Sequence, residues 1–205
     1  MHLRINDVTV DLGRIDELGE VLANKALPVV VAQRGSLGLL CAADRTTGNC
    51  AIVSLWDSIG SLEASEKAIG SIRGETVDAV GAQLNSISVA EVLREVSVSP
   101  SKVGTRSRVV RLTAPARSRE RMVEFYDAEA VPRLKSQPGF LNSRLVQQVE
   151  DETRFAAISH WSDGAALDSS DKASAALRDL VAQTIPGTAV ERVSAAEIIL
   201  MERTS

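Results

Sequence analysis

The chain contains an internal repeat. Residues 51–68 align without a gap to residues 156–173, and seven of the 18 aligned positions are identical, including the two tryptophans of the chain. A second stretch, residues 27–35, aligns with residues 131–139 and shares a proline, a glutamine and a glycine. Since a repeat of roughly 100 residues is the size of a small domain, the sequence predicts two copies of one fold.

The expected elements follow the same order in both copies. Alternating apolar residues at 8–12 and 109–112 predict first strands, and helical spacing of apolar residues follows each of them. These first helices cover residues 13–27 and 117–136, and a proline, Pro28 or Pro132, is expected to kink or end each one. The later elements are a strand pair, a second helix and a last strand: 37–43, 50–56, 60–84 and 87–96, then 140–149, 154–161, 164–184 and 189–203.

This order predicts an α+β fold. A β-α-β-β-α-β unit forms a four-stranded antiparallel ferredoxin-like sheet with both helices on one face. Residues 51–53 and 156–158 are apolar on both sides of their strands, which is typical of a sheet covered on both faces. We therefore expect residues 1–97 and 108–205 to form two repeats, joined by a linker at 98–107, whose sheets pack into a barrel within one chain.

Composition excludes several function classes. The net charge is −4 and aromatic residues make up only 3% of the chain, so nucleic acid is not an expected partner. No apolar run is long enough to span a membrane, and the N-terminus lacks a signal-peptide core, so a cytoplasmic location is expected. Cys41 and Cys50 flank a turn. They are either two reduced buried thiols or a disulfide or metal pair, although no further metal ligand stands at zinc-site spacing.

The second repeat resembles a known family. The motif consists of Pro132, the run Gln137–Leu141, the run Phe155–Trp161, and Ala166 with Leu167. It resembles the antibiotic-biosynthesis-monooxygenase-like group of the dimeric α/β barrel superfamily, and the first repeat is a weaker copy. The resemblance implies two ferredoxin-like domains. It also implies an activity among cofactor-independent oxygenases of polyphenolic rings, haem-degrading enzymes, isomerases and proteins without known activity.

The sequence departs from this family's pattern on the second helix of each repeat. Members commonly carry a histidine nine residues after the tryptophan and often another about five residues later. Here these positions hold Ser65 and Ser170, then Gly70 and Ala175. The only histidines of the chain are His2 and His160. We therefore expect no haem, no metal and no other cofactor.

Five of the six aromatic residues fall in the second repeat. This asymmetry predicts either a pocket for a flat apolar ligand or simply a core of larger residues. For the pocket hypothesis, the candidate catalytic residues are His160, Tyr126 and Arg111, and the candidate lining residues are Trp161, Phe125, Phe140 and Trp56. Each also has a structural interpretation: a strand-end histidine, a solvated arginine cluster, and tryptophans packed between sheet and helices.

Two functions therefore stand at this point. One is a monooxygenase that binds a small aromatic or polyketide-like molecule, mainly in the second repeat, with His160 moving protons and Tyr126 and Arg111 orienting oxygen atoms. The other is a barrel that has lost this chemistry and serves as a small-ligand-binding or protein-interaction module. In either case the expected state is a monomeric pseudo-dimer or a homodimer, with a small molecule as partner.

Overall fold

The computed structural model describes residues 1–204. The first repeat contains β1 (His2–Thr9), η1 (Leu12–Arg14), α1 (Ile15–Val21), η2 (Leu22–Ala26), α2 (Leu27–Val31), β2 (Ser36–Ala43), β3 (Asn49–Trp56), α3 (Ile59–Ala64), α4 (Glu66–Ala79) and β4 (Gln83–Ser97). The second contains β5 (Arg106–Thr113), α5 (Arg119–Phe125), η3 (Tyr126–Ala130), α6 (Val131–Lys135), β6 (Phe140–Gln148), β7 (Arg154–Trp161), α7 (Gly164–Ser169), α8 (Asp171–Thr184) and β8 (Ala189–Arg203). Apart from η1, the two series have the same order, which confirms the duplication.

The chain divides into two compact units that exchange the ends of their last strands. Unit 1 comprises Met1–Ala90, Lys102–Gly104 and Ala196–Ser205, and unit 2 comprises Glu91–Ser101 and Thr105–Ala195. The long strands β4 and β8 therefore each begin in one unit and end in the other. Each unit completes its sheet with a strand end supplied by the other repeat.

The strands form a closed hydrogen-bonded order. This order is β1-β3-β2-β8-β5-β7-β6-β4, and it returns from β4 to β1. Antiparallel registers link β1 to β3 and β5 to β7, with Arg4 opposite Ser54 and Arg108 opposite Ser159. The expected α+β class, with two ferredoxin-like sheets in one antiparallel barrel, is confirmed.

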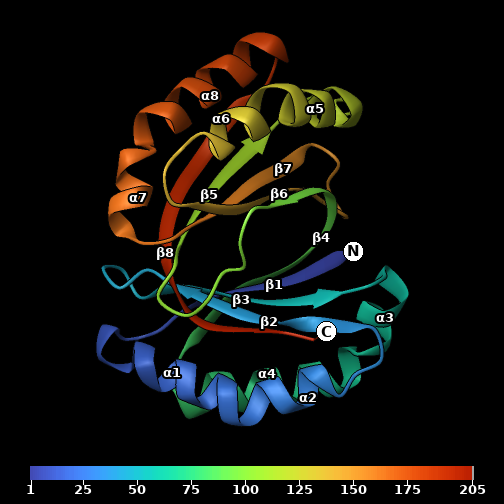
Figure 1. Cartoon of the computed structure of the whole chain (residues 1–205). Helices are drawn as coiled ribbons and strands as arrows, with labels where there is room; N and C mark the ends of the chain where they lie inside the picture. Colours follow the sequence, from blue (N-terminus) through green and yellow to red (C-terminus); the bar gives the residue numbers. More distant parts are fainter. Residues whose placement is uncertain (205) are drawn as a thin grey trace. The chain divides into compact units, whose positions relative to one another are not determined.

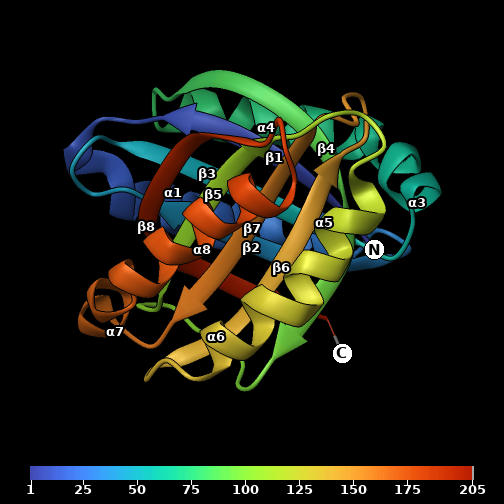
Figure 2. The same ribbon diagram turned by 90° about the horizontal axis from the view of Figure 1, so that it is seen from above.

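In each unit the helices cover one face of the sheet. Helices α5, α6 and α8 lie over β5, β6 and β7, and α1, α2 and α4 lie over β1, β2 and β3 (Figure 1). Figure 2 shows α8 and α5 running along the same face of the second sheet. The apolar residues between these layers form the main core of each unit, which in unit 1 includes Cys41 and Cys50. Both cysteines are buried free thiols, as the first of the two interpretations predicted.

The prolines do not end the first helices. A π-helical turn, η2 or η3, comes immediately before α2 and α6, and Pro28 and Pro132 stand in the first turn of these short helices. A proline cannot donate the usual main-chain hydrogen bond, and the first turn of a helix does not require that bond. The wider turn therefore lets the chain continue as a helix through each proline.

Two boundaries differ most from the sequence prediction. The first strand is His2–Thr9 rather than residues 8–12. Its buried residues include the polar Arg4 and Asn6, so the strand lacks the alternation of apolar and polar residues that predicts a strand. The second helix of the first repeat ends at Ala79 rather than at residue 84, because Gly81 adopts a left-handed φ of 57° and β4 begins at Gln83. None of the helices within residues 1–204 is long and apolar enough to cross a membrane.

Candidate functional site

A cavity of about 70 Å³ lies between the sheet and the helices of unit 2. Roughly 10–15 Å³ of such space is enough for one water, so the cavity is large enough for several waters or the core of a small organic molecule. Its walls are mainly apolar side chains from β5, β6, β7, η3 and α8. The lining residues are Arg108, Val110, Leu112, Met122, Phe125, Tyr126, Ala130, Leu134, Ser143, Leu145, Ala157, Ser159, Ser174, Leu177, Arg178 and Val181.

Two buried hydroxyl groups in this lining lack hydrogen bonds. The Tyr126 side chain belongs to η3 and the Ser143 side chain to β6, and their residues are only 3% and 1% exposed. Neither hydroxyl makes a well-oriented hydrogen bond to another described residue, although the two lie close enough for the Ser143 hydroxyl to lower the pKa of Tyr126. A buried polar group without a partner costs about 1–3 kcal/mol. The protein therefore keeps two polar groups, at a cost in stability, beside a cavity in which a ligand oxygen could bind them.

Tyr126 is protonated at neutral pH. Burial raises its pKa to about 12, and the nearby Ser143 hydroxyl and Arg144 guanidinium only partly oppose this rise. A neutral phenol can donate a hydrogen bond, and it is too weak an acid to act as a base near pH 7. Tyr126 can therefore hold a ligand oxygen but cannot accept the ligand's proton.

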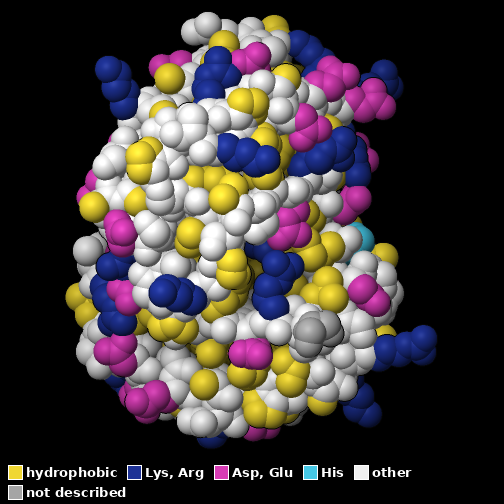
Figure 3. All heavy atoms as spheres, in the orientation of Figure 1, with side chains coloured by type: hydrophobic (Ala, Val, Ile, Leu, Met, Phe, Trp, Pro, Cys, Tyr) yellow, Lys and Arg dark blue, Asp and Glu magenta, His cyan; other side chains and the backbone are white. Residues whose placement is uncertain are grey.

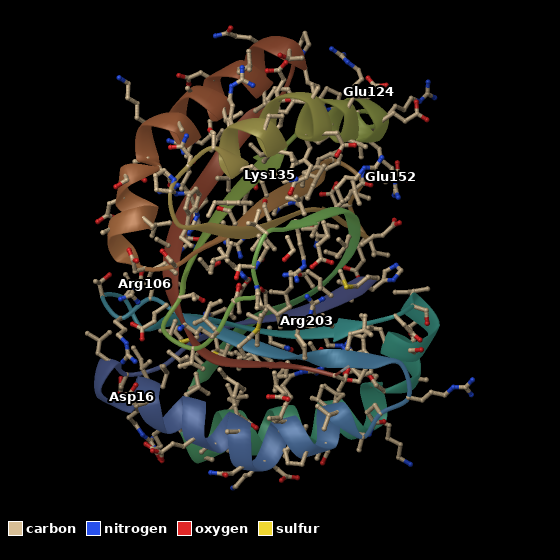
Figure 4. The ribbon with its side chains drawn as sticks, viewed as in Figure 1. Asp16, Arg106, Glu124, Lys135, Glu152 and Arg203 are labelled. Carbon is tan, nitrogen blue, oxygen red and sulfur yellow. The ribbon has the colours of Figure 1, made fainter. Side chains whose placement is uncertain are left out.

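The cavity opens between α6 and α8. The lining residues Leu134 on α6 and Leu177 and Arg178 on α8 are partly exposed, whereas Tyr126 and Ser143 lie deeper. Glu124 on α5 and Lys135 on α6, both labelled in Figure 4, are exposed and do not line the cavity. The entrance therefore carries one cationic group, the guanidinium of Arg178, at the edge of an apolar interior.

The second lining arginine, Arg108, has a structural role. Its Nη1 donates to Ser170 Oγ at 2.6 Å and its Nη2 donates to the Leu167 carbonyl at 2.8 Å and pairs with Asp171. The guanidinium carbon also lies 5.9 Å from the ring centre of Trp161, and the indole Nε1 donates to Ser159 Oγ at 3.0 Å. Because Arg108 is fixed in this way, it connects the start of α8 to the sheet and is not available to a ligand.

Unit 1 repeats this framework around a smaller cavity of about 40 Å³. Arg4 donates to Ser65 Oγ and the Leu62 carbonyl and lies 5.8 Å from the ring centre of Trp56. The residues at matching positions differ in size. Ile52, Ile69, Leu39 and Leu22 in unit 1 stand where Ala157, Ser174, Ser143 and Tyr126 stand in unit 2. Unit 2 therefore has more space and more polar groups on the same frame.

The predicted catalytic residues are not brought together. Along β7, Ala157 and Ser159 face the cavity, so His160 faces the opposite side of the sheet. Its Nδ1 lies 2.7 Å from Ser101 Oγ, which also accepts a hydrogen bond from Asn142 at 2.8 Å. Arg111 likewise alternates with Val110 and Leu112, which face the cavity. Of the three residues, only Tyr126 lines the cavity.

The predicted lining residues divide in the same way. Phe125 lines the cavity, whereas Trp56 and Trp161 are fully buried beneath Arg4 and Arg108. Phe140 packs edge-on against Trp161, with ring centres 5.6 Å apart and planes at 72°. This cluster, with Leu167, lies beside the strand ends rather than around the cavity.

Sequence reasoning missed Ser143 and Arg178. The alignment of the two repeats contains the sequence pattern that could have identified them. At matching positions, unit 2 has small or polar residues where unit 1 has large apolar residues, as with Ser143 and Leu39. This pattern identifies cavity residues only on the face of the sheet that the helices cover. Among residues 1–204, no group of three or more His, Cys, Asp or Glu side chains could hold a metal ion.

Comparisons with known proteins match the second repeat to a family model. Residues 106–183 match the family model described as antibiotic biosynthesis monooxygenase. The uncharacterised proteins Rv2557 and Rv2558 of Mycobacterium tuberculosis are 24% and 26% identical over 65% and 68% of this chain. The aligned parts span only 58% and 56% of those two proteins, less than two thirds of their length.

Solved structures share the fold over nearly the whole chain. A proposed monooxygenase from Lactobacillus acidophilus aligns with a TM-score of 0.73 and 12% identity, covering 98% of this chain and 95% of that one. An anthrone oxidase-like protein aligns with a TM-score of 0.65 and 16% identity, covering 98% and 93%. A haem-degrading enzyme from Listeria monocytogenes aligns with a TM-score of 0.55 and 11% identity, covering 96% and 99%. The second repeat therefore matches the antibiotic biosynthesis monooxygenase family model, and the whole chain shares its fold with solved structures that duplicate the same unit.

Proposed function

We propose that the cavity of unit 2 binds a small oxygenated aromatic molecule and supports its cofactor-independent oxidation by molecular oxygen. The observation that carries the proposal is the pair of buried hydroxyls without partners, Tyr126 and Ser143, in an otherwise apolar cavity. A phenol or ketone oxygen of the ligand would satisfy both of them. Apolar walls with a few placed polar groups are typical of small-molecule sites.

Cavity size limits the ligand. The enclosed space of about 70 Å³ is smaller than the roughly 150 Å³ of an engineered apolar cavity known to bind benzene. A single ring fits only if flexible lining side chains such as Met122 move, and methionine adapts readily. A three-ring anthrone would place one ring inside and the others in the entrance between α6 and α8. A ligand that is oxidised is therefore proposed to be a larger ring system bound by one end, whereas a compact phenol is proposed only to bind.

The proposed reaction needs no cofactor. A methylene group between aromatic rings is oxidised to a carbonyl group: one atom of oxygen forms the new C=O bond, and the other leaves as water with both methylene protons. Oxygen reacts with such substrates after they lose a proton, and no carboxylate or imidazole lines the cavity to accept one. The substrate would therefore enter as an anion, with Tyr126 donating a hydrogen bond to its oxygen and the apolar walls excluding water.

Haem does not fit these residues. At the positions where haem-degrading relatives carry a histidine, Ser65 and Ser170 are buried, and each donates to a carbonyl of the preceding helix, Leu62 or Leu167. A cavity of about 70 Å³ is also far smaller than a porphyrin ring. The proposal therefore uses no step through haem.

Oxygen uptake with dithranol, a dihydroxyanthrone, tests the reaction. The wild type is expected to raise the rate above the spontaneous oxidation, and Tyr126→Phe is expected to lower that enhancement by about tenfold or more, since a hydrogen bond to a charged group contributes about 1.5–3 kcal/mol. Glu124→Gln, on the outer face of α5, is the matched control and should behave as the wild type. An equal rate for Tyr126→Phe, or a loss only in His160→Ala, would place the chemistry outside this cavity.

Binding without turnover is the second candidate function. The cavity's lack of a proton-accepting side chain favours it, because a neutral ligand could bind there and remain unreacted. In this case phenols would raise the melting temperature of the wild type and not of Tyr126→Phe, while oxygen uptake would stay at the spontaneous rate for both.

A further inference from the structure

The arginine that lines the cavity on the second helix has different partners in the two repeats. In unit 1, Arg73 on α4 lines the cavity and pairs with Glu66, whose two carboxylate oxygens accept from its guanidinium at 3.1 and 3.2 Å. The same carboxylate also pairs with Arg4 at 2.8 Å. Glu66 therefore neutralises two arginines, and the charge of the cavity arginine is already balanced by the protein.

In unit 2 the matching acidic residue is one methylene group shorter. Asp171 stands where Glu66 stands, and it pairs with Arg108, the counterpart of Arg4. Arg178, the counterpart of Arg73, donates only to the neutral Ser174 Oγ, at 2.9 Å. No carboxylate within residues 1–204 pairs with Arg178, although its guanidinium is partly buried at the cavity.

We infer that the cavity of unit 2 selects an anionic ligand, and that the shorter carboxylate of Asp171 makes this possible by leaving Arg178 without a counter-ion. The inference rests on the proposed function, because it assumes that a ligand occupies this cavity. A guanidinium has five donors and prefers to hold a carboxylate through two parallel bonds. Arg178 uses one donor on Ser174, so the others can face a ligand's acidic group.

This arrangement defines a ligand class. The acidic group would lie at Arg178 in the entrance, the ring would lie among the apolar walls, and a ring oxygen would reach Tyr126 and Ser143. The class is the hydroxyaryl carboxylates, together with phenols acidic enough to bind as phenolates. Within this class, a phenolate would also supply the deprotonated form that the proposed oxidation requires.

The test compares para-hydroxybenzoate with para-hydroxybenzamide, which have the same shape but differ in charge. With calorimetry on the full-length protein, we expect the wild type to bind the acid at least about tenfold more tightly than the amide, since a charge-assisted hydrogen bond contributes roughly 1.5–3 kcal/mol. Arg178→Gln should lose this preference and keep its affinity for the amide. Asp171→Glu should lose it too, because the longer side chain can pair with Arg178 as Glu66 pairs with Arg73.

The reverse substitution, Glu66→Asp, is the matched control. It makes the same change of chain length in unit 1, where Ile52 and Ile69 fill more of the cavity, and should leave acid binding unchanged. Equal affinities of the wild type for acid and amide, or a preference that survives Arg178→Gln, would overturn the inference and leave the cavity proposal standing. Failure of both probes to bind the wild type would overturn both.

Discussion

The two repeats have the same framework and different cavities. In each, an arginine from the first strand donates to a serine and a carbonyl at the start of the second helix and lies over the tryptophan of the third strand. Each tryptophan in turn donates to a serine two residues before it, at 2.9 Å in unit 1 and 3.0 Å in unit 2. The arginine, serine and tryptophan contacts that stabilise the fold are therefore the same in both repeats, whereas the residues that face the cavity differ.

The difference between shared framework and differing cavities distinguishes residues that stabilise the fold from residues that could bind a ligand. A residue that both repeats share in the same contact, such as Trp161 with Trp56, can be explained by stability alone. A residue that differs at matching cavity positions, such as Tyr126 with Leu22, cannot be required by the fold, because the fold forms with either. The two repeats of one chain therefore show which positions the fold requires and which positions are free to differ.

The largest effect is expected for the shared tryptophans. Trp56→Ala and Trp161→Ala should each lower the free energy of unfolding by about 3–5 kcal/mol, since both side chains are fully buried and support a buried arginine. Urea unfolding followed by circular dichroism measures this. Trp→Phe at each site is the milder control and should cost less. If one tryptophan cost less than about 1 kcal/mol, its repeat would not depend on the shared framework.

The framework could be predicted from the sequence and the cavity could not. The repeat, the element order and the fold class follow from identities spaced about a hundred residues apart, because those identities mark framework residues. The first strand was placed too late, because Arg4 and Asn6 are polar residues buried in it. Polar groups buried with partners break the alternation of apolar residues on which strand prediction depends.

The candidate catalytic residues lie apart for a different reason. Tyr126, His160 and Arg111 were grouped by chemistry, and a strand separates neighbours onto opposite faces. His160 therefore lies on the other side of the sheet from Tyr126, although Ser159 beside it lines the cavity. The residues that line one cavity are determined by the register of several strands and by the sizes of their side chains. The spacing of residues along the sequence does not reveal either of these.

An intermediate effect is expected from exchanging cavity residues between the repeats. Ala157→Ile introduces the residue that unit 1 has at Ile52, and filling the cavity should raise the free energy of unfolding by about 0.5–2 kcal/mol while weakening phenol binding. The reverse change, Ile52→Ala, should lower stability by about 2–4 kcal/mol, since it enlarges the cavity of unit 1. Urea unfolding and calorimetry measure the two effects. Ala157→Ile with unchanged phenol binding would show that the ligand lies elsewhere.

The last effect is a change in stability at alkaline pH. Tyr126 is the only tyrosine of the chain, so the near-ultraviolet absorbance of phenolate reports it alone. Its pKa is raised to about 12 in the folded protein by burial, and an exposed tyrosine in the unfolded chain titrates near 10. Between these values the unfolded chain releases a proton that the folded protein keeps. The contribution of Tyr126 to stability is therefore complete below about pH 10 and is lost as the pH rises toward about 12.

Unit 1 supplies the contrast for this titration, because Leu22 stands at the matching position and cannot ionise. The absorbance midpoint should fall from about 12 toward about 10 in concentrated urea, and Tyr126→Phe should remove both the signal and this part of the pH dependence. A midpoint near 10 in the folded protein would mean that solvent reaches the Tyr126 hydroxyl. The buried hydroxyl pair would then no longer distinguish the second cavity from the first, and the main support for a ligand site in unit 2 would be removed.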